Sequence, residues 1–205
     1  MRLAVLVSGT GSILEAISHS GIEISLVVAD RECEAIQRAL DRGLNVELIE
    51  RLDFGEKFDR VAFTNQLVRK LEIAEIELIA MAGFGTILEK PIYDAYAGKV
   101  LNTHPSLLPA FPGWNAVEEA IIAGVEETGC TIHQATLEVD SGTILAQEIV
   151  PILEGDDTSS LHDRIKRIER KLYVSLIKRI MNEPDYGSVA SRRQLDFVPC
   201  LVVRL

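Results

Sequence analysis

The chain has 205 residues, of which 47% are hydrophobic and 25% are charged, an ordinary composition for a globular protein with one sizeable core. Its formal net charge of -10 argues against nucleic acid or a membrane surface as a partner, because binding to phosphates is driven by Lys and Arg. Three widely separated cysteines, Cys33, Cys130 and Cys200, suggest neither a disulfide framework nor a zinc site, and they suit a reducing compartment.

The first half of the chain alternates apolar runs with amphipathic segments. Residues 2–7 form an apolar run that ends in Ser-Gly-Thr-Gly-Ser, which predicts a buried strand leading into a glycine turn. Further strands are predicted at 22–29, 45–49, 77–82 and 99–102, and helices at 13–20, 34–42 and 58–72. This alternation is typical of an α/β fold with a doubly wound, mostly parallel central sheet and helices on both faces.

The second half has a different pattern. A helix is predicted at 114–123, and strands at 130–139 and 144–151 are joined through Asp140-Ser141-Gly142, which indicates an antiparallel addition to the sheet. A long helix follows at 159–182, with Asp157 or Thr158 as its cap. The pattern weakens after Asn182. We therefore expect one domain over residues 1–182 and a tail over 183–205 that packs on this domain or on a neighbour.

The glycine turn after the first strand has the form of a phosphate cradle. Glycines permit a tight turn, and the following helix directs free N–H groups at an anion. Leu14 stands where a dinucleotide fingerprint requires a small residue, and no Gly-Lys-Ser/Thr follows, so a monophosphate on a small substrate is the expected ligand. A plain strand-to-helix turn is the alternative.

The run from Leu101 to Pro109 carries the clearest chemical signal. Asn102 and His104 are two residues apart in an extended segment and therefore face the same side, and Pro105 then restricts the backbone. A hydrogen-bond donor beside a proton-transfer group suits acyl chemistry. Asp140 also follows a strand, and in an open α/β sheet it could lie beside His104 and keep the ring charged, although Asp-Ser-Gly is also a common turn.

The other histidines carry less weight. His133 alternates with Thr131 on a predicted strand, and we interpret it as a core histidine with satisfied hydrogen bonds. No second His or Cys has the spacing that would complete a metal site, so metal-independent chemistry is expected.

Five motifs in this order resemble the phosphoribosylglycinamide formyltransferase family, the folate-dependent enzymes of purine synthesis. The motifs are Ser-Gly-Thr-Gly-Ser at 8–12, Ala-Gly-Phe at 82–84, Asn-Thr-His-Pro-Ser-Leu-Leu-Pro at 102–109, Thr-Gly-Cys-Thr-Ile-His at 128–133 and Val-Asp-Ser-Gly at 139–142. The resemblance covers residues 1 to about 182. It implies formyl transfer from 10-formyltetrahydrofolate to the amine of glycinamide ribonucleotide.

The resemblance also implies roles for individual residues. It makes Asn102, His104 and Asp140 the catalytic group. The residues implied to bind the ribonucleotide are Gly11, Ser12, Ile13, Lys166 and Glu169. Those implied to bind the folate are Arg60, Thr86, Ile87, Leu88, Asn102, Thr136, Leu137 and Asp140.

The chain departs from the family pattern at three places. Ile13 stands where the family often has Asn, which leaves only a backbone contact there. Gly85 and Thr86 stand where a larger residue and often Arg are usual, which would loosen that wall of the folate pocket. The long helix has Glu169-Arg170 and Tyr173-Val174 in place of Glu-His and an aromatic residue followed by Pro.

Other functions stay open on the sequence. A formyltransferase that acts on an amino-sugar nucleotide would use the same donor chemistry, and a catalytically silent nucleotide-binding module would keep the glycine turn. Methionyl-tRNA formyltransferase and formyltetrahydrofolate hydrolase are disfavoured, because each is expected to carry a further domain. The N-terminal apolar run is too short for a signal peptide, so a cytoplasmic location is expected. Separately, we expect a monomer or a homodimer.

Overall fold

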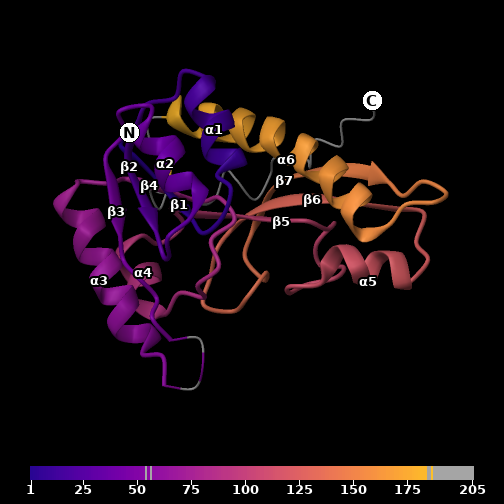
Figure 1. Ribbon diagram of the computed structural model, residues 1–205, viewed down its shortest axis with the longest axis horizontal. Helices are drawn as coiled ribbons and strands as arrows, with labels where there is room; N and C mark the ends of the chain where they lie inside the picture. Colours follow the sequence, from indigo (N-terminus) through magenta and orange to yellow (C-terminus); the bar gives the residue numbers. More distant parts are fainter. Residues whose placement is uncertain (54, 56, 184–185, 187–205) are drawn as a thin grey trace. The chain divides into compact units, whose positions relative to one another are not determined.

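The computed structural model describes residues 1–53, 55, 57–183 and 186. The chain, shown in Figure 1, divides into two compact units: unit 1 (Met1–Leu101) and unit 2, which begins at Asn102. Strand β5 (Val100–His104) begins in unit 1 and ends in unit 2. Most of the predicted tail at 183–205 falls outside the described residues, so its packing stays a prediction.

Four parallel strands form the sheet of unit 1. They are β1 (Leu3–Val7), β2 (Ile24–Ala29), β3 (Val46–Leu48) and β4 (Leu78–Met81). Strand β1 pairs with β2 on one side and β4 on the other, and β3 pairs with β2. Every residue of β1 is fully buried, as expected for a central parallel strand covered on both faces.

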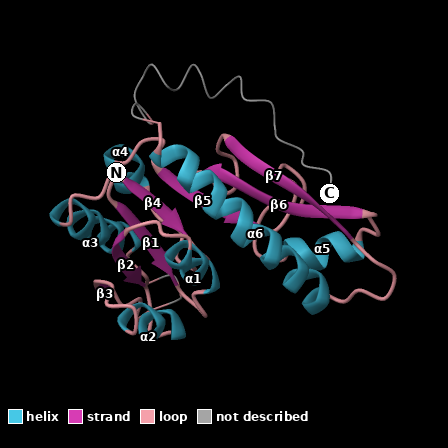
Figure 2. Ribbon diagram, turned by 90° about the horizontal axis from the view of Figure 1, so that it is seen from above, coloured by secondary structure: helices cyan, strands magenta, loops and turns pink. Residues whose placement is uncertain are grey.

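Four helices accompany these strands. They are α1 (Ser12–His19), α2 (Glu34–Leu40), α3 (Arg60–Ile73) and α4 (Lys90–Ala95). Figure 2 shows α1 and α2 on one side of the unit 1 strands and α3 and α4 on the other, which is the doubly wound arrangement. Helix α4 was not predicted, because its six residues are too few to display a helical period.

Gly11 makes the tight turn from β1 into α1 possible. It is the N-cap residue of α1 and has a φ of 76°, a left-handed conformation that favours glycine. A Cβ on Gly11 would lie 2.8 Å from the Cβ of Ala35 on α2. No side chain caps α1, so the free N–H groups of its first turn have no capping partner from a side chain.

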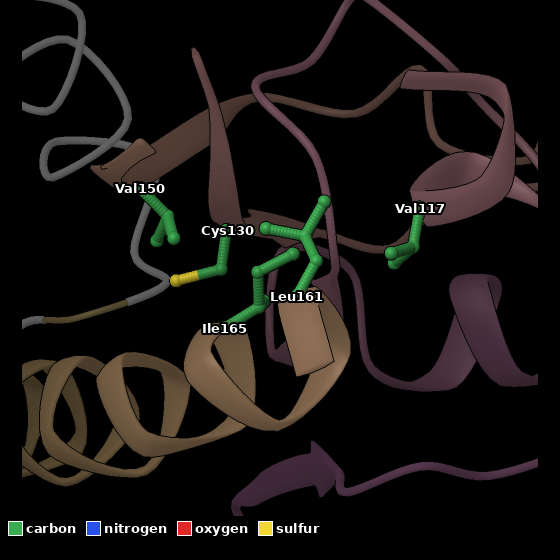
Figure 3. Packing of buried hydrophobic residues seen from close by; sticks show 5 residues of the cluster. All are labelled: Val117, Cys130, Val150, Leu161 and Ile165. Carbon is green, nitrogen blue, oxygen red and sulfur yellow. The ribbon is translucent and has the colours of Figure 1, made fainter. Parts of the chain in front are cut away.

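Unit 2 contains an antiparallel pair covered by two helices. Strands β6 (Glu127–Gln134) and β7 (Ile144–Pro151) pair with Thr131 opposite Gln147. Helices α5 (Ala116–Ile122) and α6 (Thr158–Met181) pack beside them, and Asp157 forms a capping box with Ser160 at the start of α6. The core lies between these elements, where the side chains shown in Figure 3 meet: Val117, Cys130, Val150, Leu161 and Ile165.

The strand predicted over 130–139 was misplaced, because β6 spans 127–134 instead. After Gln134 the chain leaves the ladder and returns at Thr143, whose carbonyl accepts a hydrogen bond from the Gln134 N–H. Gly142 lies so close to the Gln134 carbonyl that a side chain has no room there. Leu137 and Val139 alternate as in a strand, yet they are 53% and 51% exposed. Asp140 therefore lies in a loop rather than at a strand end.

No helix among the described residues combines the length and the apolar character needed to cross a membrane.

Substitution of Gly11 by Ala should destabilise the protein by about 2–4 kcal/mol, because left-handed backbone costs an L-residue about 1–2 kcal/mol and overpacking against Ala35 adds a similar amount. Urea denaturation measures this change in the free energy of unfolding. Gly9→Ala is the matched control, because a Cβ at Gly9 meets nothing within 4 Å. Equal stabilities of the two variants would contradict the prediction.

Candidate active site

Strand β5 directs its last three residues to two sides. The amide of Asn102 lies 3.1 Å from Nε2 of His133, and the ring of His104 lies beside Asp140. Thr103, between them, donates a hydrogen bond of 2.7 Å from its hydroxyl to Oε1 of Glu169 on α6. The alternation of side chains along an extended segment therefore separates the amide and imidazole from the Glu169 carboxyl.

The His104 ring is buried between two acceptors. Its Nε2 lies 2.7 Å from the carbonyl oxygen of Phe111, and its Nδ1 lies 3.3 Å from Oδ2 of Asp140. A carbonyl oxygen and an ionised carboxylate can only accept hydrogen bonds, so this arrangement suits a ring that carries a proton on both nitrogens. Such a ring is a hydrogen-bond donor and a proton source.

Asp140 connects the loop in which it lies to the loop that contains Gly113. Its backbone is left-handed, with a φ of 55°, and its Oδ2 accepts a hydrogen bond of 2.9 Å from the Gly113 N–H. Burial by itself would raise the pKa of this carboxyl, but hydrogen bonds from His133 and Gly113 and the charge of His104 lower the pKa below its ordinary value. Asp140 is therefore ionised at neutral pH although its side chain is 5% exposed.

His133 is a member of the site that the sequence interpretation missed. It is 1% exposed, as a core histidine would be, but its Nε2 lies 3.5 Å from Oδ1 of Asp140 and close to the Asn102 amide. Its Nδ1 faces the Gln134 carbonyl at 3.1 Å and so carries a proton. The signal was present in the Thr-Ile-His motif, where His133 shares a strand face with Thr131.

Thr131 fixes the backbone that follows His104. Its hydroxyl donates to the carbonyl of Ser106 at 2.6 Å and accepts from the Leu108 N–H at 3.1 Å. Gln147 on β7 donates from Nε2 to the Leu108 carbonyl at 2.9 Å. These buried hydrogen bonds hold the residues after His104 on the β6–β7 pair, and Ser106 acts as a structural residue of the turn.

Two hydroxyl groups in the loop that carries Asp140 donate hydrogen bonds to the same carbonyl oxygen. The hydroxyls of Thr136 and Ser141 both donate to the carbonyl of Glu138, at 2.8 and 2.9 Å. Thr136 and Leu137, implied folate residues, therefore lie in the same loop as Asp140. Both Thr136 and Leu137 are exposed to solvent, and their roles stay predictions.

Helix α6 presents the two residues implied for the ribonucleotide in unit 2. Glu169 is 9% exposed, and burial raises the pKa of its carboxyl, an effect that the Thr103 hydrogen bond and the charge of Lys166 partly offset. Lys166 has a 41% exposed side chain and lies 3.8 Å from Asp163. A nearly buried carboxyl beside a solvated ammonium suits a polar ligand, and this role stays a prediction.

The other implied residues belong to unit 1. Gly11 and Ser12 form the start of α1, and the Ile13 side chain is 5% exposed, so only its backbone is available to a phosphate. Arg60 begins α3, is 51% exposed at its side chain and lies 3.6 Å from Glu89.

The last three implied folate residues follow β4, in the segment 82–88 that we call the wall loop. Within the wall loop, Thr86 and Leu88 are buried, while Ile87 is 37% exposed. The Thr86 hydroxyl donates to Asp30, so it is directed at the protein.

Within the described part of the chain, no cluster of three His, Cys, Asp or Glu side chains is placed to hold a metal ion.

Known proteins are similar to this chain over most of its length. The model of the formyl transferase family matches residues 1–177. The phosphoribosylglycinamide formyltransferase of Mycobacterium tuberculosis is 39% identical over 181 residues, which cover 86% of this chain and 83% of that protein. The trifunctional purine biosynthetic protein adenosine-3 of Gallus gallus is 38% identical over 187 residues, which cover 88% of this chain and 18% of the relative. This chain thus spans less than a fifth of the length of that trifunctional protein.

A solved structure extends the comparison to the fold. The crystal structure of phosphoribosylglycinamide formyltransferase from Bacillus halodurans matches with a TM-score of 0.83 at 32% identity, over 92% of this chain and 100% of that one. The expected fold class, a mostly parallel α/β sheet with an antiparallel C-terminal addition, is confirmed. Because the family model covers far more than half of its residues, this chain belongs to the formyl transferase family.

Proposed function

We propose that this chain transfers a formyl group from 10-formyltetrahydrofolate to the amine of glycinamide ribonucleotide, giving formylglycinamide ribonucleotide. The observation that supports it best is the buried Asp140 carboxylate, which lies within 3.3 Å of His104 and 3.5 Å of His133, with the Asn102 amide beside them. A module that only binds nucleotides has no need of an ionised, buried carboxylate between two histidines.

The reaction joins the amine nitrogen to the formyl carbon and breaks the bond from that carbon to N10. The donor supplies an activated formyl group on a nitrogen that can leave. Asn102 and the charged His104 would donate hydrogen bonds to the formyl oxygen as it gains negative charge. Asp140 keeps His104 charged and aligned, and it can organise a water that carries the amine proton to N10, which balances the transfer.

His104 must exchange one partner before it can act. Its Nε2 is occupied by the Phe111 carbonyl at 2.7 Å, and its Nδ1 faces Asp140. Donation from Nε2 to the formyl oxygen therefore requires that the Phe111 carbonyl moves away. Phe111 has a φ of 52°, an uncommon conformation for a bulky residue, which marks this loop as strained at a functional position.

The binding roles follow the family resemblance. We propose that the free N–H groups near Gly11, Ser12 and Ile13 hold the phosphate of the ribonucleotide, and that Lys166 and Glu169 bind the same substrate. The proposed folate contacts are Arg60, Thr86, Ile87, Leu88, Asn102, Thr136, Leu137 and Asp140. We also propose a formyltransferase domain over 1–182, a cytoplasmic location and a monomeric or homodimeric state.

His104→Ala should lower kcat by about 10²–10³, the usual cost of losing one donor to a developing oxyanion, while the KM values for both substrates change little. Steady-state kinetics with varied donor and acceptor measures this split. His19→Ala, at the exposed end of α1, is the control and should retain normal turnover. A kcat of His104→Ala near that of the unmodified chain would remove His104 from the reaction.

Asp140→Asn should lower kcat and also change its pH dependence. Because the pKa of Asp140 lies below its ordinary value, the carboxylate is ionised throughout the neutral range, and kcat should fall at acidic pH as Asp140 becomes protonated. Asp140→Asn has no carboxyl to titrate, so this acidic decline should be absent from its profile. Asp94→Asn, an exposed carboxyl on α4, should leave the profile unchanged. An unaltered profile in Asp140→Asn would reduce Asp140 to a turn residue.

The proposed reaction is tested by mixing the protein with 10-formyl-dideazafolate and glycinamide ribonucleotide and following the absorbance change of deformylation. We expect turnover with the ribonucleotide and none above background with an amino-sugar nucleotide. Turnover only with the amino-sugar nucleotide would show that this nucleotide, and not glycinamide ribonucleotide, is the acceptor. Binding of the ribonucleotide without deformylation would favour the nucleotide-binding module.

A further inference from the structure

Asp30 is a fully buried carboxylate in unit 1 that the proposed catalytic group does not use. It follows the last residue of β2, at the edge of the sheet where the carboxyl ends of the parallel strands gather. Arg31 forms two hydrogen bonds with it, from Nε to Oδ1 at 2.9 Å and from Nη2 to Oδ2 at 3.1 Å. The Thr86 hydroxyl adds a third, to Oδ2 at 2.7 Å. A carboxylate with this many donors is held in one orientation.

Ser8 connects the same carboxylate to a second point of the wall loop. Its hydroxyl accepts a hydrogen bond of 2.6 Å from the Gly85 N–H and is also a hydrogen-bond partner of Asp30. Thus the ends of β1 and β2 both hold the wall loop, one at the backbone of residue 85 and the other at the side chain of residue 86. These hydrogen bonds pull the carboxyl in the direction opposite to burial, and the pKa of Asp30 lies below its ordinary value, so Asp30 is ionised.

The Arg31 guanidinium group lies close to the position that a side chain at residue 85 would occupy. A Cβ on Gly85 would lie 2.9 Å from Nη2 of Arg31 and 3.5 Å from the Ser8 hydroxyl. The small residue at 85 and the cation at 31 are therefore parts of one arrangement. What the sequence alone presents as a loosened wall is, in the structure, a wall approached closely by the guanidinium group of Arg31, which follows β2.

We propose that Asp30 is a positioning residue for the formyl donor, because its hydrogen bond with Thr86 fixes the backbone of the wall loop, which carries the proposed folate contacts Thr86, Ile87 and Leu88. This inference rests on the proposed function for the identity of the ligand. The wall loop lies between β4 and α4 outside the strands, so its conformation depends on the hydrogen bonds that Gly85 donates to Ser8 and Thr86 donates to Asp30. The donor is then recognised by backbone groups whose placement depends on a buried charge.

The first test removes one hydroxyl at nearly constant volume. Thr86→Val should raise the Kd for 10-formyl-dideazafolate about tenfold, because a hydrogen bond to a charged group is lost and the loop samples other conformations. The Kd for glycinamide ribonucleotide, measured in the same calorimeter, should stay within about twofold, a split that a general loss of stability would not produce. Thr86→Ser keeps the hydroxyl and should restore donor binding.

Thr128→Val is the matched control. Thr128 is a buried threonine on β6, and its hydroxyl has no hydrogen-bond partner among the described residues. The same substitution there removes a hydroxyl without breaking a hydrogen bond, so donor binding should be unchanged. Asp30→Asn, which places an amide NH2 among the donors of Arg31 and Thr86, should weaken donor binding more than Thr86→Val does.

Amide hydrogen exchange decides the positioning role without any reaction. In the unliganded protein, Thr86→Val should accelerate exchange of the peptide that covers the wall loop by about tenfold, and Thr128→Val should not. Unchanged exchange in Thr86→Val, or equal donor Kd values for Thr86→Val and Thr128→Val, would overturn the inference. Absence of turnover in the unmodified chain would instead overturn the proposed function, while the exchange result and analogue binding would still decide the role of Asp30.

Discussion

A single buried carboxylate organises the described active site. Asp140 is ionised, nearly inaccessible to solvent and surrounded by the His104 ring, the His133 ring and the N–H group of Gly113. An unpaired charge in such a place is very costly, so the surrounding groups must be present together. The left-handed backbone of Asp140 is the local cost of directing the carboxylate toward both rings.

Strand β5 explains how few residues are needed to build two functional surfaces. Consecutive side chains of a strand point in opposite directions, so Asn102 and His104 reach the carboxylate while Thr103 reaches Glu169 on α6. The proposed catalytic residues Asn102 and His104 and the implied ribonucleotide residue Glu169 are thus positioned by one strand. A shift of one residue in this strand would exchange the two sets.

The two compact units each contain a buried acidic group that orients a loop. In unit 1, Asp30 holds the wall loop, and in unit 2, Asp140 holds the loop that contains Gly113. Both carboxyl groups have their pKa lowered against the effect of burial, because each receives several hydrogen bonds. Loops that bind ligands lack the ladder of a sheet, and a charged acceptor supplies a strong substitute.

The sequence by itself determined the α/β class and the parallel strands of unit 1, and it named Asn102, His104 and Asp140, which the fold brings together, because periodicity and motifs act over short stretches of chain. It could not determine where β6 ends, since Leu137 and Val139 continue the apolar alternation although Gly142 and Gln134 close a loop there. It also could not reveal that His133 approaches Asp140, or that Arg31 fills the space beside Gly85. Only the tertiary structure decided these contacts. Arg31 and Gly85 are far apart in sequence, and the contacts of Gln134 with Gly142 and of His133 with Asp140 depend on a loop whose local pattern is equally typical of a strand.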